Sequence, residues 1–480
     1  MFFRLAKNSF SLLIVGLVDK LAFVLLFAIL ARKLTQFEFG IYSLALTLIF
    51  IGGMITNFGI GNVIIREVAK NRERAKALFN NALLLTLVFS LLTWPLVIGL
   101  ALLLNYADEV VFLLSFGGSV FLFMGVGQIA SAILRAYERM EIFGLIGSFH
   151  SIINLGLSVL VLLMGGGLMA LVIVLIITEG FKAAILALIV HRYFAPIRWQ
   201  YDNAVIMLIV KQAIPFALLM AYGMLHRRLD LLMMGWLSPL EEVAIYGMAA
   251  KFADFLSLFS GSMAGALFPA LSAKLTSSRQ ESRRLYNDSI GIFAILGFGS
   301  AFSIMVLAEP IIFFVFGETY VSGTVALRWL GWAFLFSVLS GPVGILLLAA
   351  GDQMYRVLTM CVVVLGSNAL LNFYLIPLFG YNGAAIATFV STVLSFIGHL
   401  ILSQIYFGQF PNIAVIVWRA PLAALCMAFV LKTLSGLHIL ILIVIGGLTY
   451  GVILAALGEF RETRYQPVRI KLSKIVGTLT

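Results

Sequence analysis

The chain has 480 residues, of which 62% are hydrophobic and 11% are charged, and its mean hydropathy is +1.09. This composition excludes a soluble globular domain and is typical of a protein that crosses a membrane many times. The net charge of +11 would suit nucleic acid, but the lysines and arginines gather in the short segments between apolar stretches. We interpret that charge as a topology signal, and we expect no nucleic-acid partner.

Long apolar stretches follow one another along the whole chain. About 20 apolar residues cross a hydrocarbon core of about 30 Å, and on this criterion we predict an all-α polytopic protein of about 14 transmembrane helices. The first stretch is too long for a signal peptide and lacks a small-residue cleavage site, so we interpret it as the first span. The expected spans are residues 8–31, 40–65, 80–104, 110–134, 143–164, 168–190, 211–237, 242–270, 287–308, 324–350, 356–376, 382–406, 412–431 and 438–457.

The basic residues indicate how these spans are oriented. When the loops are numbered alternately from an inner N-terminus, basic clusters such as residues 66–76 and 461–474 fall on the inner side. Four basic residues fall on the outer side: Arg32, Lys33, Arg328 and Lys432. The positive-inside rule therefore predicts that both termini lie in the cytoplasm and that the protein is a multi-pass component of the cell membrane.

The beginning of the chain contains a recognisable pattern. Within residues 31–45, ARKLTQFEFGIYSLA, the sequence has Ala-Arg-x-Leu, a short turn, and then Glu38, Phe39, Gly40 and Tyr42. Together with IIREVAK at residues 64–70, this stretch resembles the polysaccharide (lipid-linked oligosaccharide) flippases of the multidrug/oligosaccharidyl-lipid/polysaccharide exporter superfamily. Thr35 stands where Gly or Ser is common in that family. The resemblance implies a helical membrane transporter but does not identify its cargo.

Short matches recur in the same order in the two halves of the chain. Residues 38–42 match residues 242–246, residues 78–81 match residues 285–288, and Asn154 matches Asn368. We therefore predict two parallel six-helix repeats with a substrate site near the midplane between them, because an even number of spans makes both repeats enter from the same side. The predicted regions are an N-terminal lobe (1–200), a C-terminal lobe (201–410), and two additional transmembrane helices with a basic cytoplasmic tail (411–480).

Charged residues inside apolar spans are the candidate functional residues. Asp19 and Lys20 lie at mid-depth in the first span, and Glu179 and Lys182 lie one turn apart in the sixth. A local ion pair between residues three apart on a helix is the structural interpretation of Glu179 and Lys182. The alternative is that they, like Asp19, couple an ion to transport.

The seventh span, residues 211–237, carries the densest charge. Arg227, Arg228 and Asp230 lie deep inside it; 16 residues separate Lys211 from Arg227, roughly 24 Å along a helix. A charge at this depth costs at least about 2.5 kcal/mol, so it needs a partner or a water-filled cavity. A salt bridge between helices is the structural alternative, although two arginines and one aspartate leave a surplus positive charge.

The eighth span adds Lys251 and Asp254 at a similar expected depth. We therefore expect charges from the first, seventh and eighth spans to form one layer that lines a central cavity. In this hypothesis Lys20, Arg227, Arg228 and Lys251 bind an anionic substrate. The acidic groups Asp19, Asp230 and Asp254, with the pair Glu179 and Lys182, serve charge pairing or ion coupling.

Enzymatic motifs are absent from the sequence, which has no HExxH, CxxC, GxSxG, GxGxxG or Walker A pattern. Cys361 and Cys426 lie within predicted spans and indicate no disulfide and no metal site, and we expect no cofactor. The outer loops are too short to build a glycosidase-like pocket, so a membrane glycan ligase or polymerase is the least favoured function.

The leading hypothesis is a transporter, not an enzyme, that flips a polyprenyl-phosphate-linked glycan across the cytoplasmic membrane by alternating access. Arginine suits phosphate because its planar fork donates two parallel hydrogen bonds. The alternative is a multidrug or cation antiporter of the same superfamily, for which an acidic or aromatic cavity would be expected. Glycan assembly enzymes are possible partners in the first case, in addition to the lipid bilayer.

Overall fold

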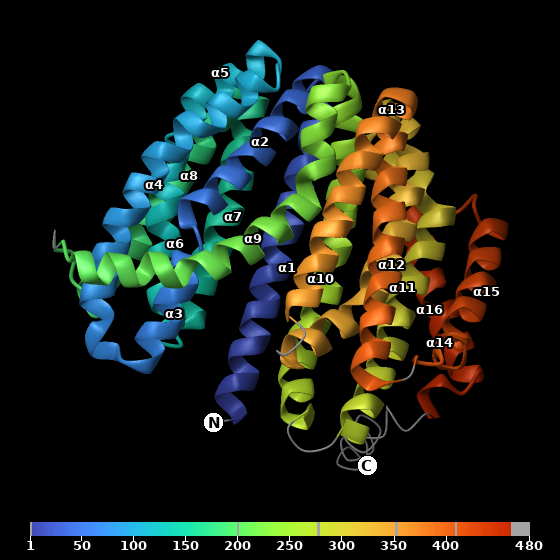
Figure 1. The fold of residues 1–480 in the computed structure, drawn as a ribbon. Helices are drawn as coiled ribbons and strands as arrows, with labels where there is room; N and C mark the ends of the chain where they lie inside the picture. The colour runs from blue at the N-terminus through green and yellow to red at the C-terminus, as the bar shows by residue number, and fades with distance from the viewer. Residues whose placement is uncertain (1, 199–200, 276–278, 351–353, 409, 462–480) are drawn as a thin grey trace, which may run out of the picture. The chain divides into compact units, whose positions relative to one another are not determined.

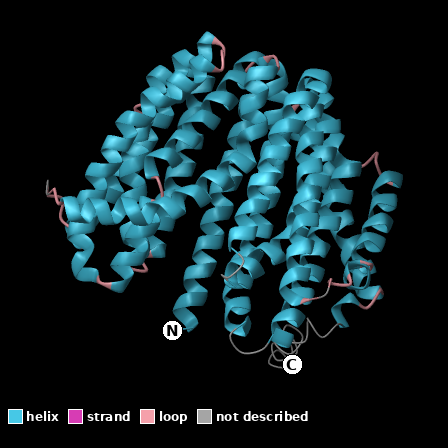
Figure 2. Ribbon diagram, in the orientation of Figure 1, coloured by secondary structure: helices cyan, strands magenta, loops and turns pink. Residues whose placement is uncertain are grey.

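The structure is a computed structural model that describes residues 2–198, 201–275, 279–350, 354–408 and 410–461 (Figure 1). Within these ranges the regular structure is entirely helical, with short turns between helices and no strand (Figure 2). This confirms the predicted all-α class. The chain divides into two compact units: the first is Met1–Met248 with Ile376–Tyr381, and the second is Ala249–Leu375 with Asn382–Thr480.

The helices of the first unit follow one another with few intervening residues. They are α1 (Phe2–Lys33), α2 (Gln36–Asn57), α3 (Ile60–Lys70), the short 3-10 helix η1 (Arg72–Arg74), α4 (Ala75–Leu103), α5 (Asp108–Gly117), α6 (Val120–Ala136), α7 (Met140–Leu163), α8 (Leu168–Tyr193) and α9 (Asn203–Leu237). The beginning of α10 (Leu240–Leu275) also belongs to this unit.

The remaining helices form the second unit, to which most of α10 contributes. They are α11 (Arg279–Phe316), η2 (Glu318–Gly323), α12 (Thr324–Ala350), α13 (Met354–Phe407), α14 (Ile413–Val417), α15 (Arg419–Thr433), α16 (Ile439–Ala456) and η3 (Glu459–Arg461). This division follows packing. The predicted division into two six-helix repeats and a C-terminal region, with boundaries at residues 200 and 410, is based on internal sequence matches and stays a prediction.

The number of spans differs from the predicted 14. Ten helices of the described residues are long and apolar enough to cross a membrane, or up to 11 if the bent pair α5 and α6 forms one span. Two predicted spans, 356–376 and 382–406, lie in the single element α13, which is kinked at Gly380 (φ 55°, ψ −135°). Another, 412–431, is divided between α14 and the 15-residue α15. The bend between α5 and α6, the break between α14 and α15 and the merging of two spans in α13 account for three of the four missing spans, and the fourth, 8–31, lies in α1, which is not among the ten.

Local chemistry explains where α2 begins and ends. The Thr35 hydroxyl accepts a hydrogen bond from the Glu38 backbone N–H, and the Glu38 carboxylate accepts one from the Thr35 backbone N–H. This reciprocal capping box satisfies donors that the first turn leaves unpaired. At the other end Phe58 and Gly59 adopt left-handed conformations (φ 44° and 76°), so the predicted span 40–65 breaks into α2 and α3.

Helix α6 lies at the centre of the first unit, where it packs against α2, α3, α4 and α8, while α1 packs along α7. Buried apolar residues of α3, α4 and α6, such as Ile64, Phe79 and Ile133, form the core. Helix α9 packs on α2, α3 and α4, contains Pro215, and changes direction along its length (Figure 1). The first unit thereby holds α1, α7 and α8 in a fixed arrangement around their polar side chains.

In the second unit α11 is the central helix and packs against α12, α15 and α16. Buried side chains of α11, such as Leu307 and Ile311, meet Met427 and Leu431 of α15 and Leu442 of α16. The two additional helices predicted for residues 411–480 are therefore integrated into the core of this unit.

The close approach of α2 to the start of α10 yields a first prediction. A Cβ atom on Gly40 would overlap the carbonyl group of Leu240, so we expect Gly40→Leu to destabilise the protein by at least about 1–3 kcal/mol through overpacking. The measurement is the melting temperature in detergent. The matched control is Gly99→Leu in α4, where no atom lies within 4 Å of the added Cβ. Equal melting temperatures for the two variants would contradict the close approach of these two helices.

Candidate functional site

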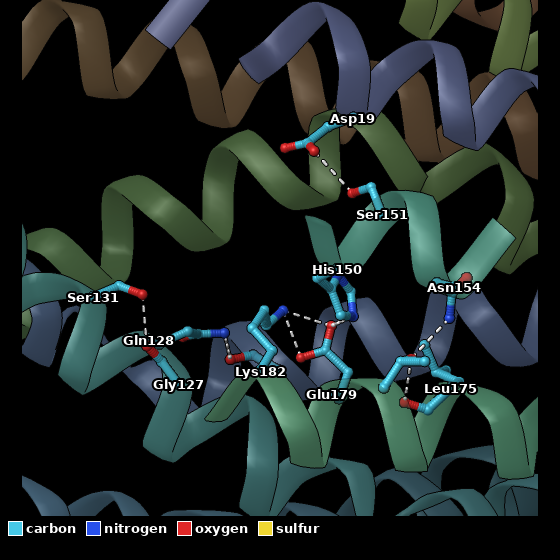
Figure 3. A network of polar contacts seen from close by, with 12 residues as sticks. Asp19, Gly127, Gln128, Ser131, His150, Ser151, Asn154, Leu175, Glu179 and Lys182 are labelled. Atoms are coloured by element: carbon cyan, nitrogen blue, oxygen red, sulfur yellow. Dashed lines mark hydrogen bonds and ion pairs between the residues drawn. The ribbon is translucent and has the colours of Figure 1, made fainter. Parts of the chain in front are cut away.

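The first unit contains a cluster of polar side chains inside helices that are otherwise apolar, and we call it the α1–α7–α8 cluster. Its members are Asp19 of α1, His150, Ser151 and Asn154 of α7, and Thr178, Glu179 and Lys182 of α8 (Figure 3). Placing a polar group inside a membrane span costs free energy, so such a group must find hydrogen-bond or charge partners within the protein. A cluster of them is therefore a functional-site hypothesis by default.

Glu179 is the buried anion of this cluster, with 7% of its surface exposed. The Lys182 ammonium lies 2.6 Å from Oε2 and 2.7 Å from Oε1 of its carboxylate, and the two residues have the i,i+3 spacing noted in the sequence. Nε2 of His150 lies 3.3 Å from Oε1. The two carboxylate oxygens thus meet a cation from their own helix and an imidazole from α7.

Asp19 is the second carboxylate of the cluster. The Ser151 hydroxyl donates a hydrogen bond of 2.8 Å to its Oδ1, because α1 packs along α7. Lys182 is close enough to interact electrostatically with Asp19 as well as with His150. Lys182 contacts Glu179 directly, whereas its interaction with Asp19 is a longer-range electrostatic one that Asp19 shares with Lys20.

Amide and hydroxyl groups surround the charged residues. The side-chain amide of Asn154 donates to the Thr178 hydroxyl at 2.9 Å, and that of Gln128 in α6 donates to the Gly53 carbonyl at 3.3 Å. The Gln128 carbonyl oxygen is buried and has no hydrogen-bond partner within the described part of the chain. Such an oxygen is a site where a further donor or a cation would be stabilised.

The charged stretch of α9 is the second candidate. Arg227 is exposed, Arg228 is half-buried, and Asp230 is 5% exposed and accepts a hydrogen bond of 2.7 Å from the Tyr246 hydroxyl of α10. The rings of His226 and Tyr222 stack with centroids 5.7 Å apart. Asp230 is therefore fixed by a neighbouring helix, while the guanidinium group of Arg227 is accessible.

A tyrosine outside the spans anchors the same part of α9. The Tyr106 hydroxyl donates a hydrogen bond of 2.8 Å to the Leu232 carbonyl. Burial raises the pKa of Tyr106 well above its usual range, so the hydroxyl keeps its proton and remains a donor throughout the physiological pH range.

The other predicted residues lie on α1 and α10. Lys20 is half-buried in the first unit. Lys251 is 2% exposed and Asp254 is half-buried, and both belong to the second unit. The expectation that they line one cavity with Arg227 and Arg228 stays a prediction. Their burial in an apolar helix agrees with the rule that a charge inside a span needs a partner or water.

The chemistry available here is charge binding and proton exchange. In the described ranges no group of three or more His, Cys, Asp and Glu side chains is placed to hold a metal ion. The sequence hypothesis missed His150, Ser151 and Gln128. Their signal was weak, because single polar residues in apolar spans are common, and only the packing of α7 against α8 brings His150 to Glu179.

Comparisons with known proteins agree with this architecture. A family model described as polysaccharide biosynthesis protein matches residues 5–275. An uncharacterized membrane protein in the cps region of Klebsiella pneumoniae is 22% identical over 352 residues, which are 72% of this chain and 69% of that protein. Agl15 of Haloferax volcanii, a probable low-salt glycan biosynthesis flippase, is 28% identical over 257 residues, which are 51% of this chain and 53% of that protein.

A solved structure shares the fold. The lipid II flippase MurJ in its inward closed conformation aligns with a TM-score of 0.78 at 16% sequence identity, covering 96% of this chain and 99% of that one. At this identity the likeness concerns the arrangement of helices, and the functional residues have to be argued from this chain's own side chains.

Proposed function

The chain belongs to the polysaccharide biosynthesis protein family, and we propose that it flips a lipid-linked oligosaccharide or polysaccharide precursor across the cytoplasmic membrane by alternating access. The name of the Haloferax volcanii relative, a glycan biosynthesis flippase, supports this function. The fold shared with a lipid II flippase supports a transport mechanism in preference to an enzymatic one. Both termini lie in the cytoplasm in this proposal, as the distribution of basic residues requires.

The observation that carries the proposal is the charge of α9. Two adjacent arginines interrupt an apolar helix, and the neighbouring carboxylate of Asp230 already accepts a hydrogen bond from Tyr246. Arg227 is exposed and presents a planar fork of donors suited to phosphate. Arg227 and Arg228, with Lys20 and Lys251, bind the anionic phosphate or diphosphate of the cargo, whose polyprenyl tail stays in the lipid.

The acidic residues have a different role in this proposal. Asp19, Asp230 and Asp254 hold the cationic side chains in place or couple an ion to the conformational change, and Glu179 and Lys182 pair within α8. The competing function is a multidrug or cation antiporter, which would place unpaired carboxylates rather than arginines against its substrate. The two functions therefore predict opposite charge selectivity.

The proposal is tested by reconstitution. The purified protein is placed in liposomes that contain a fluorescent short-chain polyprenyl-diphosphate disaccharide, and the fraction of headgroups accessible to a membrane-impermeant quencher is followed over time. We expect the wild-type protein to make the headgroups of the inner leaflet accessible to the quencher. We expect it not to transport a fluorescent lipophilic cation. Transport of the cation without flipping of the diphosphate lipid would favour the antiporter.

A further inference from the structure

The Lys182 side chain lies between Glu179 of the α1–α7–α8 cluster and helix α6, and 24% of it is exposed (Figure 3). Its ammonium contacts both oxygens of Glu179, and its Cε atom lies 3.9 Å from the position that a Cβ on Gly127 of α6 would take. The lysine stem therefore passes beside Gly127, at a distance of ordinary van der Waals contact between α6 and α8. Figure 3 shows Gln128 on the other side of Lys182 from Glu179.

Oxygen atoms of the kind that hold a small cation lie on α8, α1 and α6, and of these the Glu179 carboxylate contacts the ammonium directly. Glu179 supplies a carboxylate that is nine-tenths buried and contacts the ammonium, and Asp19 of α1 supplies a second carboxyl group, which accepts a hydrogen bond from Ser151 of α7. The Gln128 carbonyl oxygen is buried without a partner among the described residues. Hard cations prefer oxygen ligands, among them carboxylates and the carbonyl groups of Asn and Gln. A lysine ammonium is a compact point charge that satisfies the same groups.

We propose that the α1–α7–α8 cluster is a monovalent-cation site whose cation is built into the chain as the Lys182 ammonium. This inference concerns the ion and is independent of the cargo in the proposed function. A tethered cation cannot leave, so this site exchanges no metal cation during transport. Removal of the ammonium while Glu179 is kept would leave a buried anion that Na⁺ or K⁺ can neutralise.

The test compares melting temperatures of detergent-purified protein in NaCl, KCl and choline chloride. We expect the melting temperature of the wild-type protein to be the same in the three salts. Lys182→Met should melt lower in choline and should show a saturable rise of several degrees with Na⁺ or K⁺, because a ligand that binds only the folded state stabilises it by mass action. Lys182→Arg keeps the charge and should not respond.

The matched control is the double variant Glu179→Gln, Lys182→Met, which removes both charges and keeps the side-chain sizes. It should fold in all three salts, and its melting temperature should not depend on the cation. A response in Lys182→Met alone would therefore be specific to the Glu179 carboxylate that has lost its lysine partner. Lys76→Met in α4 removes an exposed charge from another helix of the first unit and should also show no response.

Three outcomes would overturn the proposal. The first is a folded Lys182→Met whose melting temperature is indifferent to Na⁺ and K⁺. The second is a wild-type protein that is itself stabilised by either ion through Glu179. The third is that folded Lys182→Met protein cannot be purified in any of the three salts, whereas the double variant can. Glu179 would then require the lysine, and no free cation could replace it. Each readout is stability, so the result stands apart from success or failure of the flipping assay.

Discussion

Replacing both Arg227 and Arg228 with alanine is expected to abolish cell-surface glycan in a flippase-deficient strain that carries the variant. Hydrogen bonds to charged groups contribute about 1.5–3 kcal/mol each, so loss of two such contacts to phosphate would slow flipping on the order of a hundredfold or more. The measurement is surface glycan by lectin or antibody binding, normalised to the amount of variant in the membrane fraction.

The matched control removes the same charge elsewhere. Arg192 and Arg198 are exposed and lie at the end of α8 and in the segment after it. The double variant Arg192→Ala, Arg198→Ala should complement the strain nearly as well as the wild-type gene. Full complementation by Arg227→Ala, Arg228→Ala would mean that the arginines of α9 are structural. The main observation that supports the proposed function would then be lost.

Lysine at the same positions separates charge from geometry. If Arg227 binds phosphate through two parallel hydrogen bonds, Arg227→Lys should also lose activity, because lysine offers only a point charge. Wild-type activity in the lysine variant would indicate a purely electrostatic contact.

The second large effect is expected for Asp19→Asn. Asp19 is a half-buried carboxylate held by Ser151, and asparagine keeps the size while removing the charge. If Asp19 couples an ion, the variant should still bind a polyprenyl-diphosphate lipid, but its flipping rate should no longer rise when an ion gradient is imposed. Reconstituted protein is assayed with and without a proton gradient, the ion gradient that Asp19 can use if the cluster exchanges no metal cation, and a sodium gradient serves as the negative control.

Two results would decide the role of Asp19. The control Asp108→Asn changes an exposed aspartate at the start of α5 and should keep the response of the wild-type protein. An unaltered gradient response in Asp19→Asn would remove Asp19 from the coupling role. A loss of lipid binding would instead place it with the residues that contact cargo.

The sequence by itself determined the class and much of the candidate chemistry. Apolar stretches of bilayer length can only be helices, because every backbone polar group in lipid must be satisfied within its own segment. The i,i+3 spacing of Glu179 and Lys182 places them on one face of a helix. In the structure the Lys182 ammonium lies 2.6 Å from Oε2 of Glu179. Both features depend on residues close together in the chain.

Only the tertiary structure decided which helices meet and where they break. Ser151 reaches Asp19 across 132 positions because α1 packs along α7, and His150 reaches Glu179 because α7 packs against α8. Apolar residues cover every face of such helices. Hydropathy therefore does not indicate that α1 packs against α7, or that α7 packs against α8. The kink at Gly380 and the break at Phe58–Gly59 likewise depend on left-handed backbone conformations that average hydrophobicity does not register. The cluster around Lys182 therefore emerges only when the helices are packed.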